Sequence, residues 1–378
     1  MGKYRFIIVG SGWRSLFYVR IARALSHDFE LCAMLCRTRE KAERLAAEHD
    51  IHTTTSAEEC VELKPDFVVV AVNKDSIADV TKEWLERGFT VLCETPASLK
   101  LETLHELWAL HEQGAKLAVA EQYIYYPFYY AIDQVLKKEW IGDPYCAVVS
   151  LAHEYHGVSL MRNFLREEMA PFQVTGKTFS FPTVETMSRY EQFTDGRTAD
   201  KKRTTAVFEF ADGKVGLYDF DSEQYRSPIR HNYLNIRGSR GEIKDNKIYY
   251  LDKDNQPRCT KLEVSTRTVE VPGEKNPNLK RIEQITQIGL HGTSDTVCIP
   301  YFNVPLASDE TAIAKVMYGV AAYAKGEKSD SEELRSPSYS LRNALQDSYM
   351  TILLQQAVST GQTVKSTGQP WHKVTVQL

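Results

Sequence analysis

Short apolar runs alternate with amphipathic stretches along the first 120 residues. The runs are continuously apolar, which is typical of strands that are buried on both faces of a parallel sheet. The stretches between them repeat with a helical period. The pattern therefore predicts a doubly wound α/β domain. Its expected strands are residues 4–9, 30–36, 66–72, 90–94 and 116–121, and its expected helices are residues 14–25, 40–48, 78–87 and 101–113.

The pattern changes after residue 122. A helix is expected over residues 127–139, and the run YCAVVSLAHEYH then opens a region of strand and turn signals. Strands joined by short Asp/Gly turns, without helical crossovers, predict an antiparallel sheet. We therefore expect a dinucleotide-binding domain over residues 1–122 and a larger α+β domain over residues 123–378. Further helices are expected at residues 311–325 and 341–359, and polar loops near residues 192–203, 272–283 and 326–337.

Composition narrows the class of protein. A formal net charge of −4 leaves no basic face for nucleic acid or anionic lipid, so a small molecule or a second copy of the chain is the expected partner. Seven cysteines lack a CxxC pair or a Cys/His cluster, which favours a reducing compartment and argues against a metal site. The start, MGKYRFIIVGSG, has no leader pattern, and no apolar run reaches membrane-spanning length. We expect a soluble cytoplasmic protein.

The turn VGSGWRS follows the first expected strand and carries Gly10 and Gly12 of a G-x-G-x-x-G pattern, with Ser15 at the third place. Glycine at the first two places allows a pyrophosphate to approach the backbone N–H groups at a helix N-terminus. An ordinary turn between a strand and a helix is the alternative. The position of the motif before a helix and further strand–helix units favours a dinucleotide site, with Trp13 and Arg14 in the same turn.

The end of the second expected strand indicates which dinucleotide binds. An acidic residue there selects NAD, but this chain has Cys36-Arg37-Thr38-Arg39. Arg37 and Thr38 could hold a 2′-phosphate through charge-assisted hydrogen bonds. The alternative is that the arginines are the solvated start of a helix. The interpretation favours NADP and keeps NAD possible.

The order and spacing of six segments along essentially the whole chain resemble the Gfo/Idh/MocA family, which contains glucose–fructose oxidoreductase and inositol dehydrogenase. The resemblance implies a Rossmann domain, a second domain with a large open antiparallel sheet, and homodimers or homotetramers built through that sheet. It also implies NAD(P)-dependent hydride transfer with a sugar, cyclitol or related polyol. The segments are VGSGWRS, REKAERLAAEHDI, AVNKDSIADVTKEWLERGFTVLCETP, WIGDPYCAV, YLNIRGSRGEI and SLRNALQDSYMTILLQQAVSTGQTV.

The resemblance also assigns the catalytic positions. The family's Glu-Lys-Pro motif falls on Glu94-Thr95-Pro96, so threonine stands where the family has lysine. The family's histidine falls on His156, while its aspartate, four residues earlier, falls on Ala152. Thr95 can donate a hydrogen bond but not a charge, a difference of roughly a few kcal/mol in transition-state stabilisation. The other expected cofactor-binding residues are Asn73, Glu94, Pro96 and Gln122.

Residues near His156 are expected to supply replacement groups. If the strand at residue 145 continues, alternation places Glu154 beside His156 as a carboxylate–imidazole pair. His153, Arg162 and Tyr123 are the expected substrate-binding residues. The alternative to a substrate-binding role is, for His153, a histidine with a satisfied hydrogen bond within the protein. For Tyr123 the alternative is packing.

Three functions agree with these residues. The first is an NAD(P)-dependent oxidoreductase of a sugar, cyclitol or polyol, with His156 as the base. The second is an enzyme that retains its cofactor and oxidises its substrate transiently during an elimination or hydration. The third is a non-catalytic sensor of nucleotides or sugars on the same scaffold. A fold alone does not choose among them.

Overall fold

The computed structural model describes residues 2–188, 191–271, 281–291, 296–297, 304–327 and 339–373. Their contacts divide the chain into two compact units. Unit 1 contains Met1–Phe128, Val264–Ile288 and Cys298–Leu345, and unit 2 contains Tyr129–Glu263, Gly289–Val297 and Gln346–Leu378. The expected domain boundary at residue 122 stays a prediction, and the grouping of two later segments with unit 1 is a feature that the sequence pattern did not indicate.

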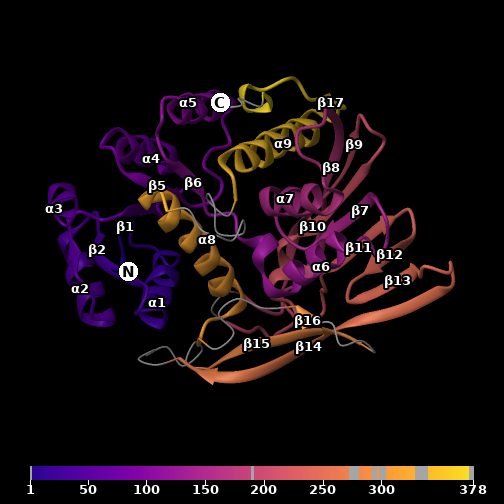
Figure 1. The fold of residues 1–378 in the computed structure, drawn as a ribbon, viewed down its shortest axis with the longest axis horizontal. Coiled ribbons are helices and arrows are strands. Elements are labelled where there is room, and N and C mark those ends of the chain that lie inside the picture. Colours follow the sequence, from indigo (N-terminus) through magenta and orange to yellow (C-terminus); the bar gives the residue numbers. More distant parts are fainter. Residues whose placement is uncertain are drawn as a thin grey trace. The chain divides into compact units, whose positions relative to one another are not determined.

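Unit 1 is built on a six-stranded sheet in the order β3-β2-β1-β4-β5-β6, and its strand pairs are parallel (Figure 1). This is the strand order of a dinucleotide-binding Rossmann domain. The predicted fold class of the first domain is therefore confirmed. The strands are β1 (Tyr4–Val9), β2 (Phe29–Leu35), β3 (Thr53–Thr54), β4 (Phe67–Val70), β5 (Thr90–Cys93) and β6 (Leu117–Val119). The helices of this part are α1 (Ser15–Ala24), α2 (Arg39–His49), α3 (Ala57–Glu62), α4 (Ile77–Glu86) and α5 (Leu101–Glu112).

A helix from the C-terminal part of the chain completes the core of unit 1. This helix, α8 (Ser308–Lys325), lies alongside α1 in Figure 1. Its residues Ile313 and Met317 are fully buried in the same apolar cluster as Phe6 of β1 and Tyr18 of α1. One face of the parallel sheet is therefore covered by residues that are distant in the sequence.

Unit 2 contains most of a second sheet, whose order is β16-β15-β14-β13-β12-β11-β7-β10-β9-β8-β17. Its described pairs are antiparallel except for β7 with β10, which is parallel. The predicted open antiparallel sheet is confirmed, with this one parallel pair added. The strands are β7 (Pro144–Ser150), β8 (Phe172–Val184), β9 (Thr198–Phe210), β10 (Val215–Asp221), β11 (Tyr233–Gly238), β12 (Gly241–Lys244), β13 (Lys247–Leu251), β14 (Pro257–Glu270), β15 (Arg281–Leu290), β16 (Thr296–Val297) and β17 (Val364–Lys365).

Helices cover one face of this second sheet. Besides α8, the helices after the Rossmann strands are α6 (Pro127–Lys137), α7 (Glu154–Leu165) and α9 (Leu341–Thr360), with the short helical turns η2 (Ser222–Tyr225) and η4 (Pro370–His372). A further helical turn, η1 (Tyr123–Tyr125), lies in unit 1. A Cβ at Gly216 of β10 would lie 2.1 Å from the sulfur of Met161, so the absence of a side chain lets α7 pack closely on the sheet.

The structure corrects the expected strand over residues 145–156. Strand β7 ends at Ser150, and α7 begins at Glu154 with His153 in an extended N-cap conformation. Glu154 in the first turn favours a helix N-terminus. Tyr155, Val158 and Leu165 recur at helical spacing and are buried, so the run of residues changes period where the strand was expected to continue.

Two of the expected polar loops overlap strands. Strand β9 begins at Thr198, inside the loop expected at residues 192–203, and β15 begins at Arg281, inside the loop expected at residues 272–283. Residues 272–280 and 328–337 of the expected loops lie outside the described residues. Within the described part of the chain, no helix has the length and apolar character needed to cross a bilayer.

Candidate active site

The glycine turn lies at the carboxyl end of β1. Gly10 has φ of +119°, and a Cβ there would lie 2.3 Å from the carbonyl oxygen of Ala71, so only glycine fits between the ends of β1 and β4. A Cβ at Gly12 would meet no atom within 4 Å. Helix α1 begins at Ser15 without a side-chain cap or an acidic residue in its first turn. The turn therefore has the tight fit, the open side and the helix terminus that a pyrophosphate needs.

Arg14 of this turn points toward protein groups. Its Nε donates to Oε1 of Glu94 at 2.7 Å. With the Gln122 amide turned so that its oxygen faces Arg14, the Nη2 of Arg14 donates to that oxygen at 3.0 Å. Its guanidinium carbon lies 4.9 Å from the ring centre of Phe17. Burial works to lower the pKa of Arg14, but the charge of Glu94, the hydrogen bond to it and smaller contributions from nearby tyrosines together outweigh burial, and the pKa lies above its ordinary value. Arg14, predicted to bind the cofactor, here holds the residues around the turn.

Glu94 accepts hydrogen bonds from Arg14, at the N-cap of α1, and from Tyr18 within that helix. The hydroxyl of Tyr18 donates to Oε1 of Glu94 at 2.6 Å, next to the bond from Arg14. Burial, and then the charge of Glu94, raises the pKa of Tyr18 well above its ordinary value, so Tyr18 stays a neutral donor. Tyr18 was not predicted as a site residue. Its spacing of four residues from Arg14, which places both side chains on one helix face, is a signal that could have found it.

The segment after Glu94 carries the threonine that replaces the family's lysine. Thr95 is half-buried, Pro96 is buried, and the peptide bond between them is cis. The Thr95 N–H donates weakly to Oε2 of Glu94 at 3.4 Å. Residues 94–96 directly follow β5, at the same edge of the sheet as the glycine turn. The Arg14–Glu94 bond thus joins the glycine turn to the segment that contains Thr95.

The remaining predicted cofactor residues lie at neighbouring strand ends. Arg37 is exposed, and within the described residues it has no ion pair, whereas Arg39 is paired with Glu43. The hydroxyl of Thr38 caps α2 by accepting from the Lys41 N–H at 3.4 Å. Oδ1 of Asn73 accepts from the Ser76 N–H at 3.0 Å. Trp13 is 50% exposed, and its ring meets that of Phe17 edge to face.

Two acidic residues of α8 approach α1 and were not predicted. Glu310 forms an ion pair with Arg20 and is almost fully buried. Burial raises the pKa of Asp309, and the charge of Arg14 opposes that rise. The α8 terminus therefore helps to set the electrostatics beside the glycine turn.

Tyr123 follows β6 and stacks on Tyr126. Their ring centres are 4.7 Å apart, with an angle of 16° between the planes. The Tyr123 N–H donates to Oε1 of the buried Glu121 at 3.0 Å. Packing thus accounts for part of the tyrosine cluster after β6, and the predicted contact of Tyr123 with substrate stays a prediction.

In unit 2, the structure brings His153 and His156 together. The two rings meet edge to face with their centres 4.9 Å apart, because the residues are three positions apart at the start of a helix. His156 is 5% exposed, whereas His153 is exposed. His156 therefore lies in a largely dehydrated setting behind an accessible histidine.

Tyr225 orients His153 and was missed by the sequence analysis. The Tyr225 oxygen accepts from the backbone N–H of His153 at 2.9 Å and lies 2.6 Å from its Nδ1. Either atom can be the donor in this second contact, because the roles of the ring nitrogens depend on the tautomer of His153. Tyr225 is far from residue 153 in the sequence, so nothing local predicted the pair.

The helix changes the expected partners of His156. Glu154 and His156 are two positions apart and lie on different faces of α7, and Oε2 of Glu154 accepts from Nε2 of Gln355. The expected carboxylate–imidazole pair from strand alternation is therefore wrong. Arg162 is 2% exposed, and its Nε donates to Oδ1 of the buried Asp347 at 2.8 Å. The guanidinium of Arg162, predicted to bind substrate, is hydrogen-bonded to a residue of unit 2.

Comparisons with known proteins agree with this geometry. Residues 4–123 match the model of an oxidoreductase family with an NAD-binding Rossmann fold. No match is found among the curated proteins.

Solved structures are similar over nearly the full chain. GenD2 from gentamicin A biosynthesis, in complex with NAD, is 16% identical with a TM-score of 0.63, covering 97% of both chains. An oxidoreductase from Agrobacterium radiobacter, in complex with NAD⁺, L-tartaric acid and magnesium, is 15% identical with a TM-score of 0.63, covering 96% of this chain and 98% of that one. A myo-inositol dehydrogenase from Corynebacterium glutamicum is 15% identical with a TM-score of 0.60, covering 97% of this chain and 100% of that one. At these identities the similarity is one of fold.

Proposed function

Residues 4–123 belong to the Gfo/Idh/MocA family of NAD-binding oxidoreductases, and on that premise we propose that the chain transfers a hydride between NAD(P) and a secondary alcohol of a sugar, cyclitol or related polyol. The observation that carries the proposal is the glycine turn. Gly10 fits against Ala71 where no side chain could, and Gly12 leaves its outer side open at the start of α1. Both features suit a dinucleotide at the carboxyl edge of the parallel sheet.

In this proposal the chain supplies binding and proton transfer, and the nicotinamide supplies the hydride acceptor or donor when bound. Gly10, Gly12 and the start of α1 hold the pyrophosphate. His156 takes the hydroxyl proton as the substrate is oxidised, and returns it in the reverse direction. The accessible His153 presents Nε2 to the substrate, because Tyr225 occupies its Nδ1.

Thr95 is expected to weaken this chemistry without abolishing it. Its hydroxyl can donate a hydrogen bond to a developing alkoxide but supplies no charge. Arg14 brings a cation to the same segment, although its guanidinium is committed to Glu94 and Gln122. We therefore propose slow or narrowly specific turnover.

NADP is the proposed cofactor form. Arg37 is exposed at the end of β2 without an ion pair among the described residues, and no carboxylate stands in its place to repel a 2′-phosphate. Lys41 adds a nearby cation, since its charge acts on the thiol of Cys36. NAD remains the alternative.

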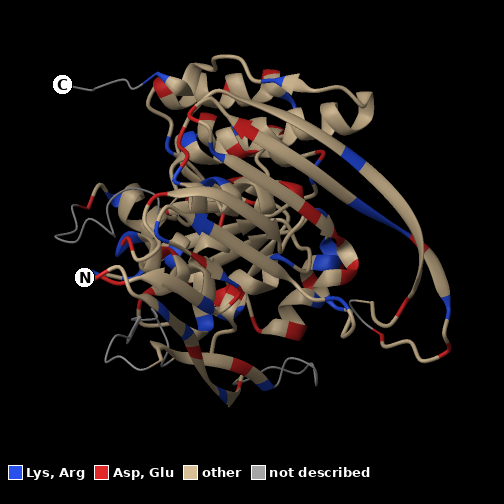
Figure 2. Ribbon diagram, turned by 90° about the vertical axis from the view of Figure 1, so that its right-hand side faces the viewer, with Lys and Arg blue, Asp and Glu red and all other residues tan. Residues whose placement is uncertain are grey.

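We also propose a homodimer or homotetramer formed through the face of the second sheet that α7 does not cover. Strand pairing places Val148, Val207 and Leu217 side by side on that face. Val215 and Tyr233 share this face, whereas Leu234 is 1% exposed and faces the helices. Acidic and basic residues are interspersed on the ribbon in Figure 2, so apolar contact rather than a field of one sign would join the copies.

The test is a screen of sugars, uronates and inositols with NADP⁺ and NAD⁺ on cofactor-stripped protein. The absorbance of reduced nicotinamide reports turnover. The proposal expects substrate-dependent reduction, faster with NADP⁺. A cofactor that survives purification, with product formed but no net reduction, would instead support transient oxidation. Measurable dinucleotide affinity with no turnover on any compound would support a sensor.

A further inference from the structure

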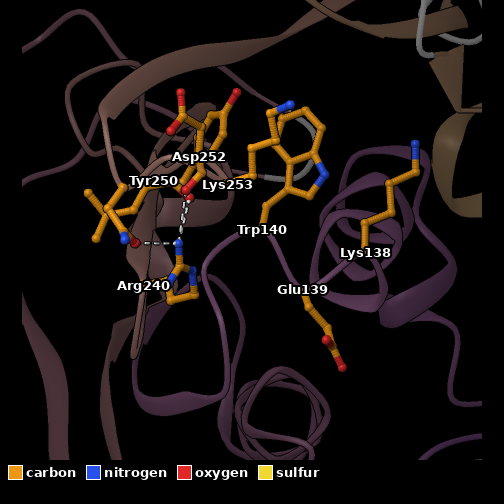
Figure 3. A pocket seen from close by; sticks show the side chains of 9 residues that line it. Lys138, Glu139, Trp140, Arg240, Tyr250, Asp252 and Lys253 are labelled. Atoms are coloured by element: carbon orange, nitrogen blue, oxygen red, sulfur yellow. Dashed lines mark hydrogen bonds between the residues drawn. The ribbon is translucent and has the colours of Figure 1, made fainter.

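A separate pocket of about 660 Å³ lies in unit 2, between the end of α6, the turn that joins β11 to β12, and the end of β13 with the turn that follows it. Its walls include Lys138, Trp140, Arg240, Tyr250 and Lys253 (Figure 3). Trp140 comes shortly before β7, whereas His153 and His156 follow the other end of that strand. The pocket is therefore distinct from the candidate active site, and the inference does not rest on the proposed function.

One wall of the pocket is held in place by its own hydrogen bonds. Nη2 of Arg240 donates to the carbonyl oxygen of Asp252 at 2.9 Å and to Oδ1 of Asn255 at 3.1 Å, as the dashed lines in Figure 3 mark. The carboxylate of Asp252 in turn accepts from the Gln256 N–H at 2.9 Å and from Nε of Arg258 at 2.8 Å. Hydrogen bonds from the backbone N–H groups of Gln256 and Asp254, and from Arg258, lower the pKa of Asp252. The conformation of this turn is therefore fixed by hydrogen bonds within the protein, without a ligand.

Three other groups in the pocket have no such partner. Among the described residues, no hydrogen bond or ion pair engages the indole N–H of Trp140, the hydroxyl of Tyr250 or the ammonium of Lys253. The Trp140 and Tyr250 rings contact each other, with centres 4.9 Å apart and an angle of 37° between the planes. All three polar groups can donate, and the indole and ammonium can only donate. They suit a ligand rich in acceptor atoms.

The charge of the walls also favours an anion. Lys138, Arg240 and Lys253 are cationic, while the charge of Asp252 is balanced by Arg258. The side chain of Glu139 points away from Trp140 and Tyr250 in Figure 3. A positive, aromatic pocket attracts a ring that bears a phosphate, since the ring contacts the indole and the phosphate lies near the ammonium.

We propose that this pocket binds a small phosphorylated ring compound, either a nucleoside monophosphate or a sugar phosphate. The ring packs on Trp140, and the phosphate oxygens accept from Lys253 and from the Tyr250 hydroxyl. The pocket volume is within the range of about 300–1,000 Å³ that is usual for small-molecule sites.

Isothermal titration of the full chain with uridine 5′-monophosphate and glucose 6-phosphate tests the proposal. The matched control probes are uridine and glucose, which lack the phosphate, and inorganic phosphate, which lacks the ring. We expect one of the two ring phosphates to bind at least tenfold more tightly than its unphosphorylated ring and than phosphate alone. The tighter of the two identifies a base or a sugar as the ring. If neither produces heat at millimolar concentration, the proposal is wrong.

Variants locate the binding. Trp140→Ala and Lys253→Ala should each weaken it by about tenfold, the scale of one charge-assisted bond or ring contact. Lys247→Ala removes an exposed lysine of β13, outside the pocket, and should leave binding unchanged. If Trp140→Ala does not fold, Trp140→Phe keeps a ring but removes the donor, and should still weaken binding measurably. Binding that is the same in the Trp140 and Lys253 variants as in the unchanged chain would assign the heat to another site and overturn the proposal.

Discussion

Nε of Arg14 lies 2.7 Å from Oε1 of Glu94, so the turn at the end of β1 is tied to the segment at the end of β5 that carries Thr95. Both side chains are largely buried, with 17% and 11% of their surfaces exposed. Tyr18 donates to the same carboxylate oxygen. A substitution at Glu94 should therefore affect the free energy of unfolding as well as the dinucleotide turn.

Glu94→Gln tests this connection. The variant keeps the size of the side chain but leaves the buried Arg14 cation without a counter-charge, which should lower the free energy of unfolding by about 3 kcal/mol. Urea unfolding followed by circular dichroism measures the loss. Glu43→Gln is the control, because the Arg39–Glu43 pair is exposed and should contribute less than about 1 kcal/mol. Equal losses in the two variants would contradict a buried connection.

The variants Gly10→Ala and Gly12→Ala should separate an effect on the stability of the fold from an effect on dinucleotide affinity. A methyl at Gly10 would meet the Ala71 carbonyl and requires a left-handed φ, so the folded chain should be destabilised by more than about 1 kcal/mol. A methyl at Gly12 meets no protein atom within 4 Å, so Gly12→Ala should fold normally yet bind dinucleotide at least tenfold more weakly. Thermal melting and fluorescence titration with NADPH measure the two effects. Unchanged NADPH affinity in Gly12→Ala would place the pyrophosphate elsewhere.

Arg37→Ala should reduce the preference for NADPH over NADH by about 1–3 kcal/mol, the range of a charge-assisted hydrogen bond. Dissociation constants for both nucleotides, measured at one salt concentration, give the difference. Arg39→Ala is the matched control, since Arg39 is already paired with Glu43 and should alter the preference little. The assignment fails if the unchanged chain binds both nucleotides equally.

His156→Ala should lower turnover by about 10²–10⁴, the usual contribution of a general acid or base, with little change in NADPH affinity. His156→Gln keeps more of the buried volume and guards against a loss that reflects packing alone. Thr95→Lys is the companion change, which should leave turnover intact or raise it. Full activity of His156→Ala on a substrate that the unchanged chain oxidises would direct the search for the base to His153.

Buried thiols should respond to pH differently from an exposed one. Burial raises the pKa of Cys60 to about 11 and that of Cys93 to about 12, whereas Cys259 is exposed. At pH 8 the thiolate of Cys60 is then only about one part in a thousand, and thiolate is the reactive form. Peptide mapping after brief alkylation should show label at Cys259 and not at Cys60 or Cys93 until urea is added. Because these pKa values are raised in the folded state, thiol ionisation favours unfolding as pH rises above the ordinary value near 9 and toward 11 to 12.

The sequence predicted the Rossmann strands well, because short continuous apolar runs are typical of strands that are buried on both faces of a parallel sheet. It failed at residues 151–156, where β7 gives way to α7, because an apolar run does not itself show where its period changes. The glycine turn was predictable from local spacing. The spacing of Tyr18 from Arg14 could have indicated Tyr18 as a site residue. Its contact with Glu94, and the contact of Tyr225 with His153, were not predictable, since each joins residues more than seventy positions apart.

The packing of α8 into the core of unit 1 has a consequence for synthesis on the ribosome. When residue 128 emerges, the face formed by Phe6, Ile8 and Tyr18 has no cover, because Ile313 and Met317 have not yet been made. At about 5–20 residues per second, the wait for α8 is roughly ten to forty seconds. The nascent Rossmann half must spend that interval with an uncovered apolar surface. We therefore expect it to bind a chaperone during that interval, and a chain shortened before residue 308 should aggregate.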